Sequence, residues 1–282
     1  MNIRSRASRG LKPKGLEAAF RPRPQAATKR TVGTVAVLGG SAAYPHAPVM
    51  AALGARSAGA GLVELEVPSA SRPAAAFWVP EATFGGGATV AAWARHDVLV
   101  AGMGLGRSRS AAAMVGRLMR FRGRLVMDAD ALNGLAAMKA AVRPTGSGWI
   151  MTPHEGEAAR LLGVAREEVA ARRRAAAEEL RRRYGATVVL KGERTLVLSA
   201  DGKRMYENRT GNPFMALGGM GDLLAGVIGA RWAYLRDDAF LAAAGGVYLH
   251  SLAADRVVAE HGDMSLGEVA RMIGSLRLRL DV

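Results

Sequence analysis

The sequence predicts an α/β fold, in which a central, mostly parallel sheet is covered by helices on both faces. Short apolar runs alternate with longer helical patterns along most of the 282 residues, as in repeated strand–helix–strand units. These runs are apolar at nearly every position, which is typical of parallel strands buried on both sides. Hydrophobic residues make up 50% of the chain, enough for the core of one large domain, expected over residues 29–282.

The elements follow in order, and glycine or proline marks several of their ends. Gly59 and Gly61 break off the first helix, and Pro68 closes the second strand. The expected strands are 34–38, 62–67, 97–102, 124–128, 149–152 and 187–191, with short ones near 195–199 and 204–208. The expected helices are 47–60, 110–120, 131–138, one that contains Glu157, the Arg-rich segment 166–183, and then 222–235, 238–260 and 265–277.

Glycine and polar residues directly follow the expected strands. Ligands of parallel sheets bind at the carboxyl ends of the strands, where the connecting loops lie. The residues that fall there are 39–41, 102–106, Asp128, His154 and Lys191. We therefore expect five loops to converge on one site.

The chain is organised around residues 208–226, N-R-T-G-N-P-F-M-A-L-G-G-M-G-D-L-L-A-G, and we call residues 208–221 the anion loop. Its glycines let backbone N–H groups approach a phosphate, and the helix that follows adds unsatisfied donors and a positive dipole. A phosphate repels a carboxylate, so Asp222 is expected to take a proton from a hydroxyl that attacks the phosphate. The alternative is a tight turn at 218–221 with Asp222 as a helix cap.

His154 and Glu157 lie three residues apart at an expected helix start, so both can face one side of its first turn. Such a pair could hold Mg²⁺ through water and contact a ribose or an amide of a ligand. A capping arrangement, with Thr152 as the N-cap and a glutamate in the first turn, explains the same residues.

Two other strand ends carry polar groups, each with a structural alternative. The run K-G-E-R-T at 191–195 suits a nucleotide phosphate or ribose, and a surface hairpin is the alternative. Asp128, Asp130 and Asn133 could bind a cation or position a substrate, although either aspartate could equally cap a helix.

The net charge of +15 is concentrated at the N-terminus, where residues 1–30 carry nine Lys or Arg and one acid, Glu17. We expect residues 1–28 to form a basic, flexible tail. Arginines at 172–174 and 181–183 alternate with glutamates, as on a solvated helix face. An aromatic content of 5% argues against a nucleic-acid partner. With no cysteine, signal core or membrane-length apolar run, we expect a cytoplasmic protein without a membrane partner.

Seven motifs occur in a fixed order from about residue 22 to the C-terminus. They are G-G-S-x-x-Y-P-x-A-P from Gly39, G-A-G-L-V from Gly59, G-x-G-L-G from Gly102, D-A-D-A-L-N from Asp128, T-P-H-x-G-E from Thr152, L-K-G from Leu190 and N-x-T-G-N-P-x-M-A-x-G-G-x-G-D from Asn208. This series resembles the NAD(P)H-hydrate dehydratase family of the ribokinase-like superfamily, without the epimerase domain that often accompanies it. No epimerase activity is therefore expected.

The resemblance implies repair of NADH or NADPH hydrated at the nicotinamide ring. Members phosphorylate the ring hydroxyl of the (6S)-hydrate with ADP or ATP and Mg²⁺, and phosphate then leaves. By matching motif, Asp222 would be the base, and the amides of Gly219 and Gly221 would hold the phosphoryl group. The implied substrate contacts are Ala47, Gly106, His154 and Asp222, the nucleotide contacts are Lys191, Gly192, Glu193, Arg194, Thr195 and Gly221, and the residue for Mg²⁺ is Glu157. A homotetramer is also implied.

The chain departs from the family pattern at a few positions. Phe214, Leu217 and Met220 stand where small or hydroxylated residues are usual, and could narrow the anion loop. Glu155 and Arg30 stand where proline and glycine are usual. Two other functions stay open: a kinase of the same fold acting on a vitamin-precursor alcohol, with a stable phosphorylated product, and a noncatalytic protein whose basic tail binds polyanions.

Overall fold

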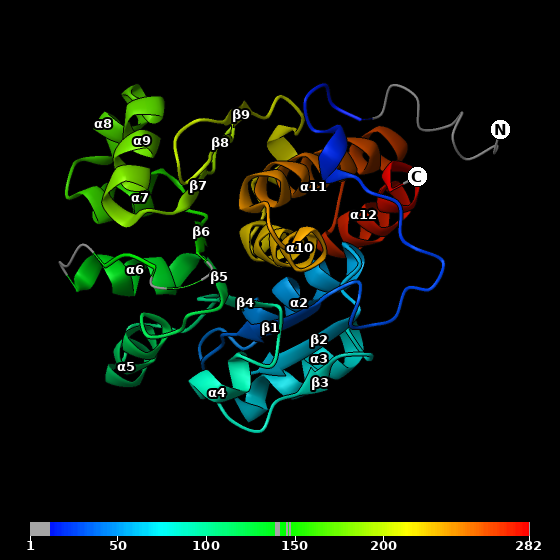
Figure 1. Cartoon of the computed structure of the whole chain (residues 1–282), viewed down its shortest axis with the longest axis horizontal. Helices are drawn as coiled ribbons and strands as arrows, with labels where there is room; N and C mark the ends of the chain where they lie inside the picture. The colour runs from blue at the N-terminus through cyan, green and yellow to red at the C-terminus, as the bar shows by residue number, and fades with distance from the viewer. Residues whose placement is uncertain (1–11, 139–141, 145, 147, 282) are drawn as a thin grey trace.

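A nine-stranded sheet forms the centre of the computed structural model, which describes residues 12–138, 142–144, 146 and 148–281 (Figure 1). Its strand order is β3-β2-β1-β4-β5-β6-β7-β8-β9. The strands from β3 to β7 are parallel to their neighbours, whereas β8 and β9 are antiparallel. The predicted mostly parallel sheet is confirmed.

The elements agree with the expected order. The strands are β1 (Thr34–Leu38), β2 (Leu62–Glu66), β3 (Thr83–Phe84), β4 (Val98–Ala101), β5 (Arg124–Met127), β6 (Trp149–Met151), β7 (Thr187–Leu190), β8 (Leu196–Leu198) and β9 (Met205–Glu207). The helices are α2 (Ala47–Ser57), α3 (Arg72–Trp78), α4 (Val90–Trp93), α5 (Arg109–Leu118), α6 (Ala129–Ala137), α7 (Glu155–Leu162), α8 (Arg166–Ala171), α9 (Arg173–Tyr184), α10 (Met220–Leu235), α11 (Ala239–His261) and α12 (Leu266–Leu280). Short 3₁₀ turns lie at η1 (Glu17–Ala19), η2 (Ser69–Ser71) and η3 (Pro213–Met215).

Two differences concern short or broken helices. The sequence analysis missed α3, α4 and β3, because elements this short show no clear periodicity. The Arg-rich helix expected as one piece is two, since the backbone leaves the helical region at Arg172, with φ −132° and ψ 48°. The other expected elements are confirmed to within a few residues at each end.

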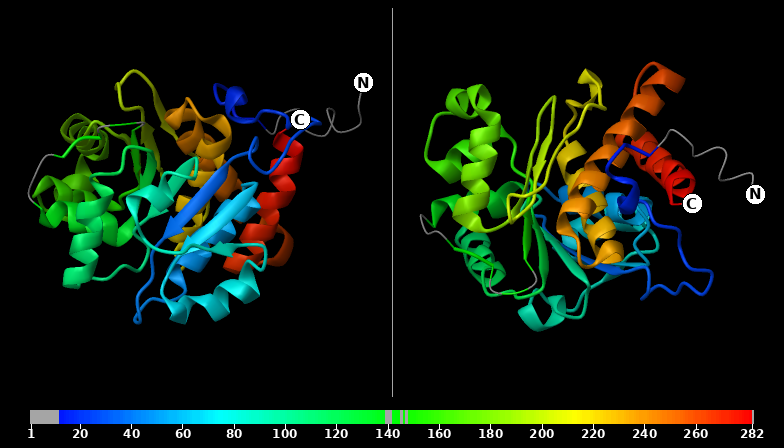
Figure 2. Two further views of the ribbon diagram at one scale, coloured as in Figure 1. Left: turned by 60° about the horizontal axis from the view of Figure 1, so that its bottom comes forward. Right: turned by 45° about the horizontal axis from the view of Figure 1, so that its top comes forward.

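Each face of the sheet has its own core, because successive strand residues point to opposite sides. In β1, Val35 and Val37 face the core shared with α2, α10, α11 and α12. Ala36 and Leu38 face the other core, which includes residues of α5, α6, α7 and α9. Figures 1 and 2 show the sheet between these two sets of helices. The helix α10 is buried along nearly its whole length, which explains why it is apolar all round.

The strand order reverses at β1, which has β2 on one side and β4 on the other. The loops after β1 and β4 therefore lead to helices on opposite faces, and such a point is where open α/β sheets bind ligands. Here the N–H of Gly40 donates to the carbonyl of Met103 at 2.8 Å, which fastens the two loops together.

Residues 12–20 of the expected tail contact the rest of the fold in part, whereas residues 21–31 are exposed; residues 1–11 lie outside the described residues. Leu16, Ala19 and Phe20 are buried in the core that contains α11. The carbonyl of Ala19 accepts a hydrogen bond from Arg231 on α10. Figure 2 shows this blue segment beside the red C-terminal helix. None of the described helices is both long and apolar enough to cross a membrane.

A buried ion pair joins Arg231, the residue on α10 that contacts this segment, to Asp281 directly after α12. Arg231 donates to both carboxylate oxygens of Asp281, at 2.9 and 3.0 Å, and its side chain is 1% exposed. Because Asp281→Asn leaves the buried guanidinium without a counter-charge, we expect a loss of about 3–5 kcal/mol in the free energy of unfolding, measured by urea denaturation.

The matched control is Asp237→Asn. Asp237 lies 4.0 Å from Arg124, but its side chain is 99% exposed, so no measurable loss is expected. Equal effects of the two substitutions would show that the Arg231–Asp281 pair contributes nothing beyond a surface contact.

Candidate active site

The anion loop ends at the N-terminus of α10. Gly219 is the N-cap, with a left-handed φ of 91° that favours glycine, and no side chain caps the helix. The N–H of Met220 donates to the carbonyl of Leu217 at 3.3 Å, and the N–H groups of Gly221 and Asp222 that follow in the first turn suit an anion. A Cβ atom on Gly221 would lie 3.2 Å from Nζ of Lys191. Gly221 thus lets the helix end come close to this ammonium, and Asp222 follows in the first turn.

Helix α11 holds the anion loop in place. Both carboxylate oxygens of Asp255 accept hydrogen bonds from it, from the N–H of Gly211 at 2.8 Å and from the side chain of Asn212 at 2.9 Å. Ser251 accepts from the side-chain amide of Asn208 at 2.9 Å. Sequence reasoning missed Asp255 and Ser251, because neither lies in a motif and both look like ordinary residues of a helix.

Lys191 is the centre of a buried cluster of charges. Its Nζ lies 2.5 Å from Asp128 Oδ1 and 3.9 Å from Glu157 Oε2, and its side chain is 17% exposed. Thr152, the N-cap of α7 in the alternative interpretation of these residues, instead donates its hydroxyl to Asp128 Oδ1 at 2.9 Å. The ends of β5, β6 and β7 therefore meet here, as the convergence of loops predicts. We call Asp128, Glu157, Lys191 and Asp222 the ionic centre.

The carboxylates of the ionic centre have unusual proton affinities. Burial raises the pKa of Asp222 to about 7, and the negative charge of Asp128 adds to the effect. Burial likewise raises the pKa of Glu157 to about 7. Burial disfavours the charged form of Lys191, but Asp128 and Glu157 outweigh it and raise the pKa of its ammonium. A carboxyl group that titrates near neutral pH is suited to act as a general base.

His154 and Glu157 form a capping box at the start of α7. The N–H of His154 donates to Glu157 Oε2 at 2.8 Å, and Nδ1 of His154 accepts from Gly156 at 3.0 Å. Capping therefore does occur, with His154 and not Thr152 as the N-cap. Burial, together with the charge of Lys191, lowers the pKa of His154, so the ring is neutral at pH 7. Half of its side chain, 54%, remains exposed to a ligand.

The described residues contain no group of three or more Asp, Glu, His or Cys side chains that could hold a metal ion by themselves. Mg²⁺ bound with a nucleotide needs only one or two carboxylates, because phosphates and water supply the other ligands. Glu157 and Asp128 at the ionic centre fit that lesser requirement.

Arg173 fastens the loop at 191–195. Its guanidinium donates to the carbonyl of Leu190 at 3.0 Å and pairs with Glu155 at 2.5 Å. Arg173 was expected on a solvated face, and its 20% side-chain exposure corrects that expectation. Glu155, which departs from the family pattern, therefore helps to hold Arg173 in place through this ion pair. Within the loop, the hydroxyl of Thr195 donates to the carbonyl of Gly192 at 3.1 Å.

Of the three bulky residues in the anion loop region, one is buried and two are exposed. Met220 is 5% exposed and belongs to the core around α10. Its side chain therefore does not narrow the anion loop. Phe214 and Leu217 are 51% and 42% exposed, so they reach solvent and do not fill the core.

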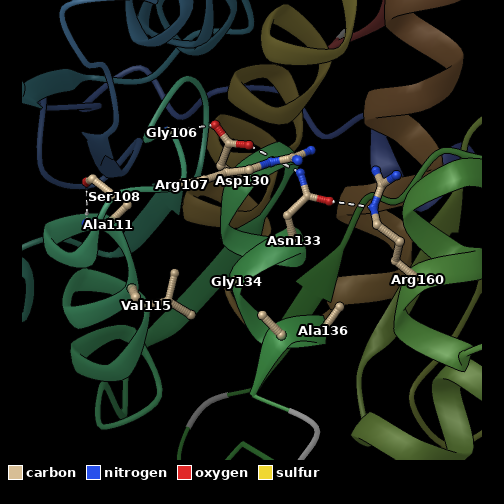
Figure 3. A pocket seen from close by; sticks show the side chains of 12 residues that line it. Gly106, Arg107, Ser108, Ala111, Val115, Asp130, Asn133, Gly134, Ala136 and Arg160 are labelled. Atoms are coloured by element: carbon tan, nitrogen blue, oxygen red, sulfur yellow. Dashed lines mark hydrogen bonds between the residues drawn. The ribbon is translucent and has the colours of Figure 1, made fainter.

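The remaining predicted contacts lie in the loops that follow β1 and β4. Ala47 is the first residue of α2, in the loop region after β1. The N–H of Gly106 donates to Asp130 Oδ2 at 2.8 Å, and Asn133 donates to the other oxygen of Asp130 at 3.2 Å. Gly106, Asp130 and Asn133 line a pocket of about 420 Å³ between α5 and α6, drawn in Figure 3.

A family model for NAD(P)H-hydrate dehydratase matches residues 35–274. The chain belongs to the NAD(P)H-hydrate dehydratase family. A curated relative, the ADP-dependent (S)-NAD(P)H-hydrate dehydratase of Neisseria meningitidis serogroup B, is 38% identical over 270 residues, covering 93% of this chain and 90% of the relative. The bifunctional NAD(P)H-hydrate repair enzyme of Coxiella burnetii is 37% identical over 92% of this chain, which spans about half, 53%, of that relative.

A solved structure of a family member has the same fold. The ADP/ATP-dependent NAD(P)H-hydrate dehydratase from Bacillus subtilis, co-crystallised with ATP and Mg²⁺, superposes with a TM-score of 0.82 at 28% identity, covering 94% of this chain and 96% of that one. The fold is therefore ribokinase-like, as the resemblance implies.

The buried carboxyl group of Asp222 should lower the stability of the folded protein at alkaline pH. Folding raises the pKa of Asp222 from its ordinary 3.8 to about 7, so the folded state favours the protonated form. The stabilisation from this group is therefore fully present below pH 3.8 and is lost as the pH rises through 7. An asparagine side chain in its place cannot ionise. We thus expect Asp222→Asn to raise the melting temperature by a few degrees at pH 8, and by much less at pH 4.

Differential scanning calorimetry at both pH values measures this effect. The exposed Asp237→Asn is the control and should leave both melting temperatures unchanged. If Asp222→Asn melts at or below the wild-type temperature at pH 8, the carboxyl group is not held in a destabilising environment.

Proposed function

We propose that the protein dehydrates (6S)-hydrated NADH or NADPH in a reaction that consumes an adenine nucleotide. The observation that carries this proposal is Asp222, a carboxyl group with a pKa of about 7 at the N-terminus of α10, beside Lys191. A base and an anion site placed together suit phosphorylation of a hydroxyl group. The names of the relatives from N. meningitidis and B. subtilis support the same substrate and co-substrate.

In the first step, Asp222 removes the proton from the ring hydroxyl at C6. The oxygen of this hydroxyl attacks the terminal phosphoryl group of the nucleotide. The new O–P bond forms as the bond to the leaving nucleotide breaks. The N–H groups of Gly219 and Gly221 and the dipole of α10 offset the negative charge that develops. Lys191 adds a fixed positive charge on the same side.

In the second step, phosphate leaves from C6, expelled by the lone pair of the ring nitrogen. Loss of a proton from C5 then restores the dihydronicotinamide. Phosphorylation makes this elimination possible, since phosphate is a far better leaving group than hydroxide. The half-exposed ring of His154, together with Ala47 and Gly106, would contact the hydrate.

The co-substrate would bind at Lys191, Gly192, Glu193, Arg194, Thr195 and Gly221. Mg²⁺ would enter with its phosphates and offset their charge, held through water by Glu157. The preferred nucleotide, a homotetrameric assembly and a cytoplasmic location stay predictions from the resemblance.

Purified protein mixed with (6S)-hydrated NADH, Mg²⁺ and ADP or ATP should restore the absorbance of NADH at a nucleotide-dependent rate. We expect Asp222→Asn to lower kcat by about 10²–10⁴-fold, the usual contribution of a general base. Asp237→Asn is the matched control and should keep the wild-type rate. No recovery from folded protein, together with a stable phosphorylated product from a thiazole or pyrimidine alcohol, would favour the kinase instead.

The rate should depend on pH through Asp222. Because the base must be deprotonated, kcat/KM should rise with pH through a midpoint of about 7, as the pKa of Asp222 requires. The charge of Asp130 helps to raise that pKa, so Asp130→Asn should move the midpoint to lower pH. A kcat/KM that stays constant between about pH 5.5 and 8.5 would show that no group of this pKa acts as the base.

A further inference from the structure

A cleft lies between the N-terminal segment and the edge of the sheet opposite the ionic centre. Its volume is about 370 Å³, and its lining residues fall within 23–32, 60–63 and 79–82, together with Arg56 on α2. The last two segments lead into β2 and β3, so the cleft lies at the amino ends of these parallel strands. Because the ionic centre lies at carboxyl ends of strands in the same sheet, the cleft is a separate site. Figure 1 shows the dark-blue N-terminal segment running past α2 on its way to β1.

Positive charge exceeds negative charge in the lining of this cleft. Arg23, Lys29 and Arg56 line it, with Glu81 as the one carboxylate among its described lining residues. Nη2 of Arg56 lies 3.0 Å from Oε1 of Glu81, and both side chains are about half exposed. Arg23 donates to the carbonyl of Gly59, and neither it nor Lys29 pairs with a carboxylate in the described part of the chain. Two positive charges therefore remain unbalanced.

A further guanidinium group, Arg277 on α12, lies behind the cleft. A Cβ atom on Gly59 would lie 2.8 Å from Nε of Arg277 and closer still to the guanidinium of Arg23, so the two groups meet there. Nε of Arg277 is buried and has no hydrogen-bond partner among the described residues. Its Nη1 lies 3.8 Å from Asp281, but both oxygens of Asp281 already accept from Arg231. The positive charges at this place are thus poorly compensated.

This crowding weakens the hold of the arginines on their protons. Burial lowers the pKa of Arg277 to about 10, and the positive charge of Arg23 adds to the effect. Partial burial also lowers the pKa of Arg23. Both shifts mean that the charged forms are disfavoured in the empty cleft. An anion bound there would offset the repulsion, and the planar guanidinium groups present parallel N–H donors that suit phosphate oxygens.

We propose that this cleft binds a phosphate-bearing anion, held by Arg23, Lys29 and Arg56. A phosphate group carries about −1.5 to −2 charges at pH 7, which matches the two unbalanced positive charges. The cleft has the size of a small-molecule site. Inorganic diphosphate and the phosphates of a nucleotide share the required chemistry. The site goes beyond the proposed function, since no residue of the ionic centre lines it.

The test uses a local reporter, because the anion loop would also bind phosphates. The chain has no cysteine, so one introduced thiol reports on one place. Ala27 is exposed and lines the cleft, whereas Ala259 on α11 is exposed and does not line it. Full-length Ala27→Cys and Ala259→Cys proteins are treated with an anionic disulfide reagent that releases a coloured thiolate. The labelling rate is measured as diphosphate is added at constant ionic strength.

We expect diphosphate to slow the labelling of Ala27→Cys to a plateau and to leave Ala259→Cys unaffected. A bound anion removes the positive charge that favours the thiolate and attracts the reagent. Adding Arg56→Gln should raise the half-effect concentration about tenfold, because a charge-assisted donor group is lost. Arg182→Gln is the matched control and should leave this concentration unchanged, since Arg182 is also an exposed helical arginine paired with one glutamate.

A second titration with ADP distinguishes the two sources of phosphate. A lower half-effect concentration for ADP than for diphosphate would assign the cleft to a nucleotide, and a higher one would assign it to a free inorganic anion. Either result supports the anion site.

Three results would overturn it. Equal half-effect concentrations in Arg56→Gln and Arg182→Gln would show that the anion does not bind at the cleft. Equal slowing by sodium chloride, when it replaces diphosphate at the same ionic strength, would show charge screening only. Protection by a single-stranded oligonucleotide without any protection by diphosphate would indicate a surface for polyanions instead.

Discussion

The site depends on burying one ammonium group among three carboxylates. Lys191 lies 2.5 Å from Asp128 and 3.9 Å from Glu157, with Asp222 close enough for its charge to be felt. Removing these charges from water is costly, and one positive charge cannot balance three negative ones. Burial and the neighbouring negative charges therefore raise the pKa values of Asp222 and Glu157 to about 7, so these carboxyl groups are partly protonated near neutral pH.

The surrounding fold makes this arrangement possible. The carboxyl ends of three neighbouring parallel strands bring Asp128, Glu157 and Lys191 to one edge, and the N-terminus of α10 brings Asp222 to the same edge. Directly after Asp128, Ala129 has a left-handed φ of 48°, which is a strained conformation for a residue other than glycine. Backbone strain and raised pKa values are common at functional sites, and here both occur at one edge of a sheet that has a large apolar core on each face.

Outside the ionic centre, single side chains fix the loops that carry the predicted ligand-binding groups. Asp255 holds the anion loop from α11, and Arg173 holds the loop at 191–195 from α9. Asp255 accepts from the backbone N–H of Gly211 and the side-chain amide of Asn212, and Arg173 donates to the carbonyl of Leu190, so these contacts within the protein hold the loops. A site organised in advance loses less free energy when it closes on a substrate and its co-substrate.

The sequence by itself determined the order of strands and helices, the parallel sheet and the edge at which the site lies. Apolar periodicity and the position of glycine are local properties, and they also place Asp222 and Lys191 at the ends of their elements. Only the tertiary structure decided the partners: that Thr152 bonds Asp128, that His154 caps α7, that Arg173 is a loop anchor, and that Leu16 and Phe20 are buried. Some of these contacts join residues that are distant in the chain, and others are one of several equivalent local hydrogen bonds. Burial and distance in the folded protein determine which contacts form, and the spacing of residues in the sequence does not.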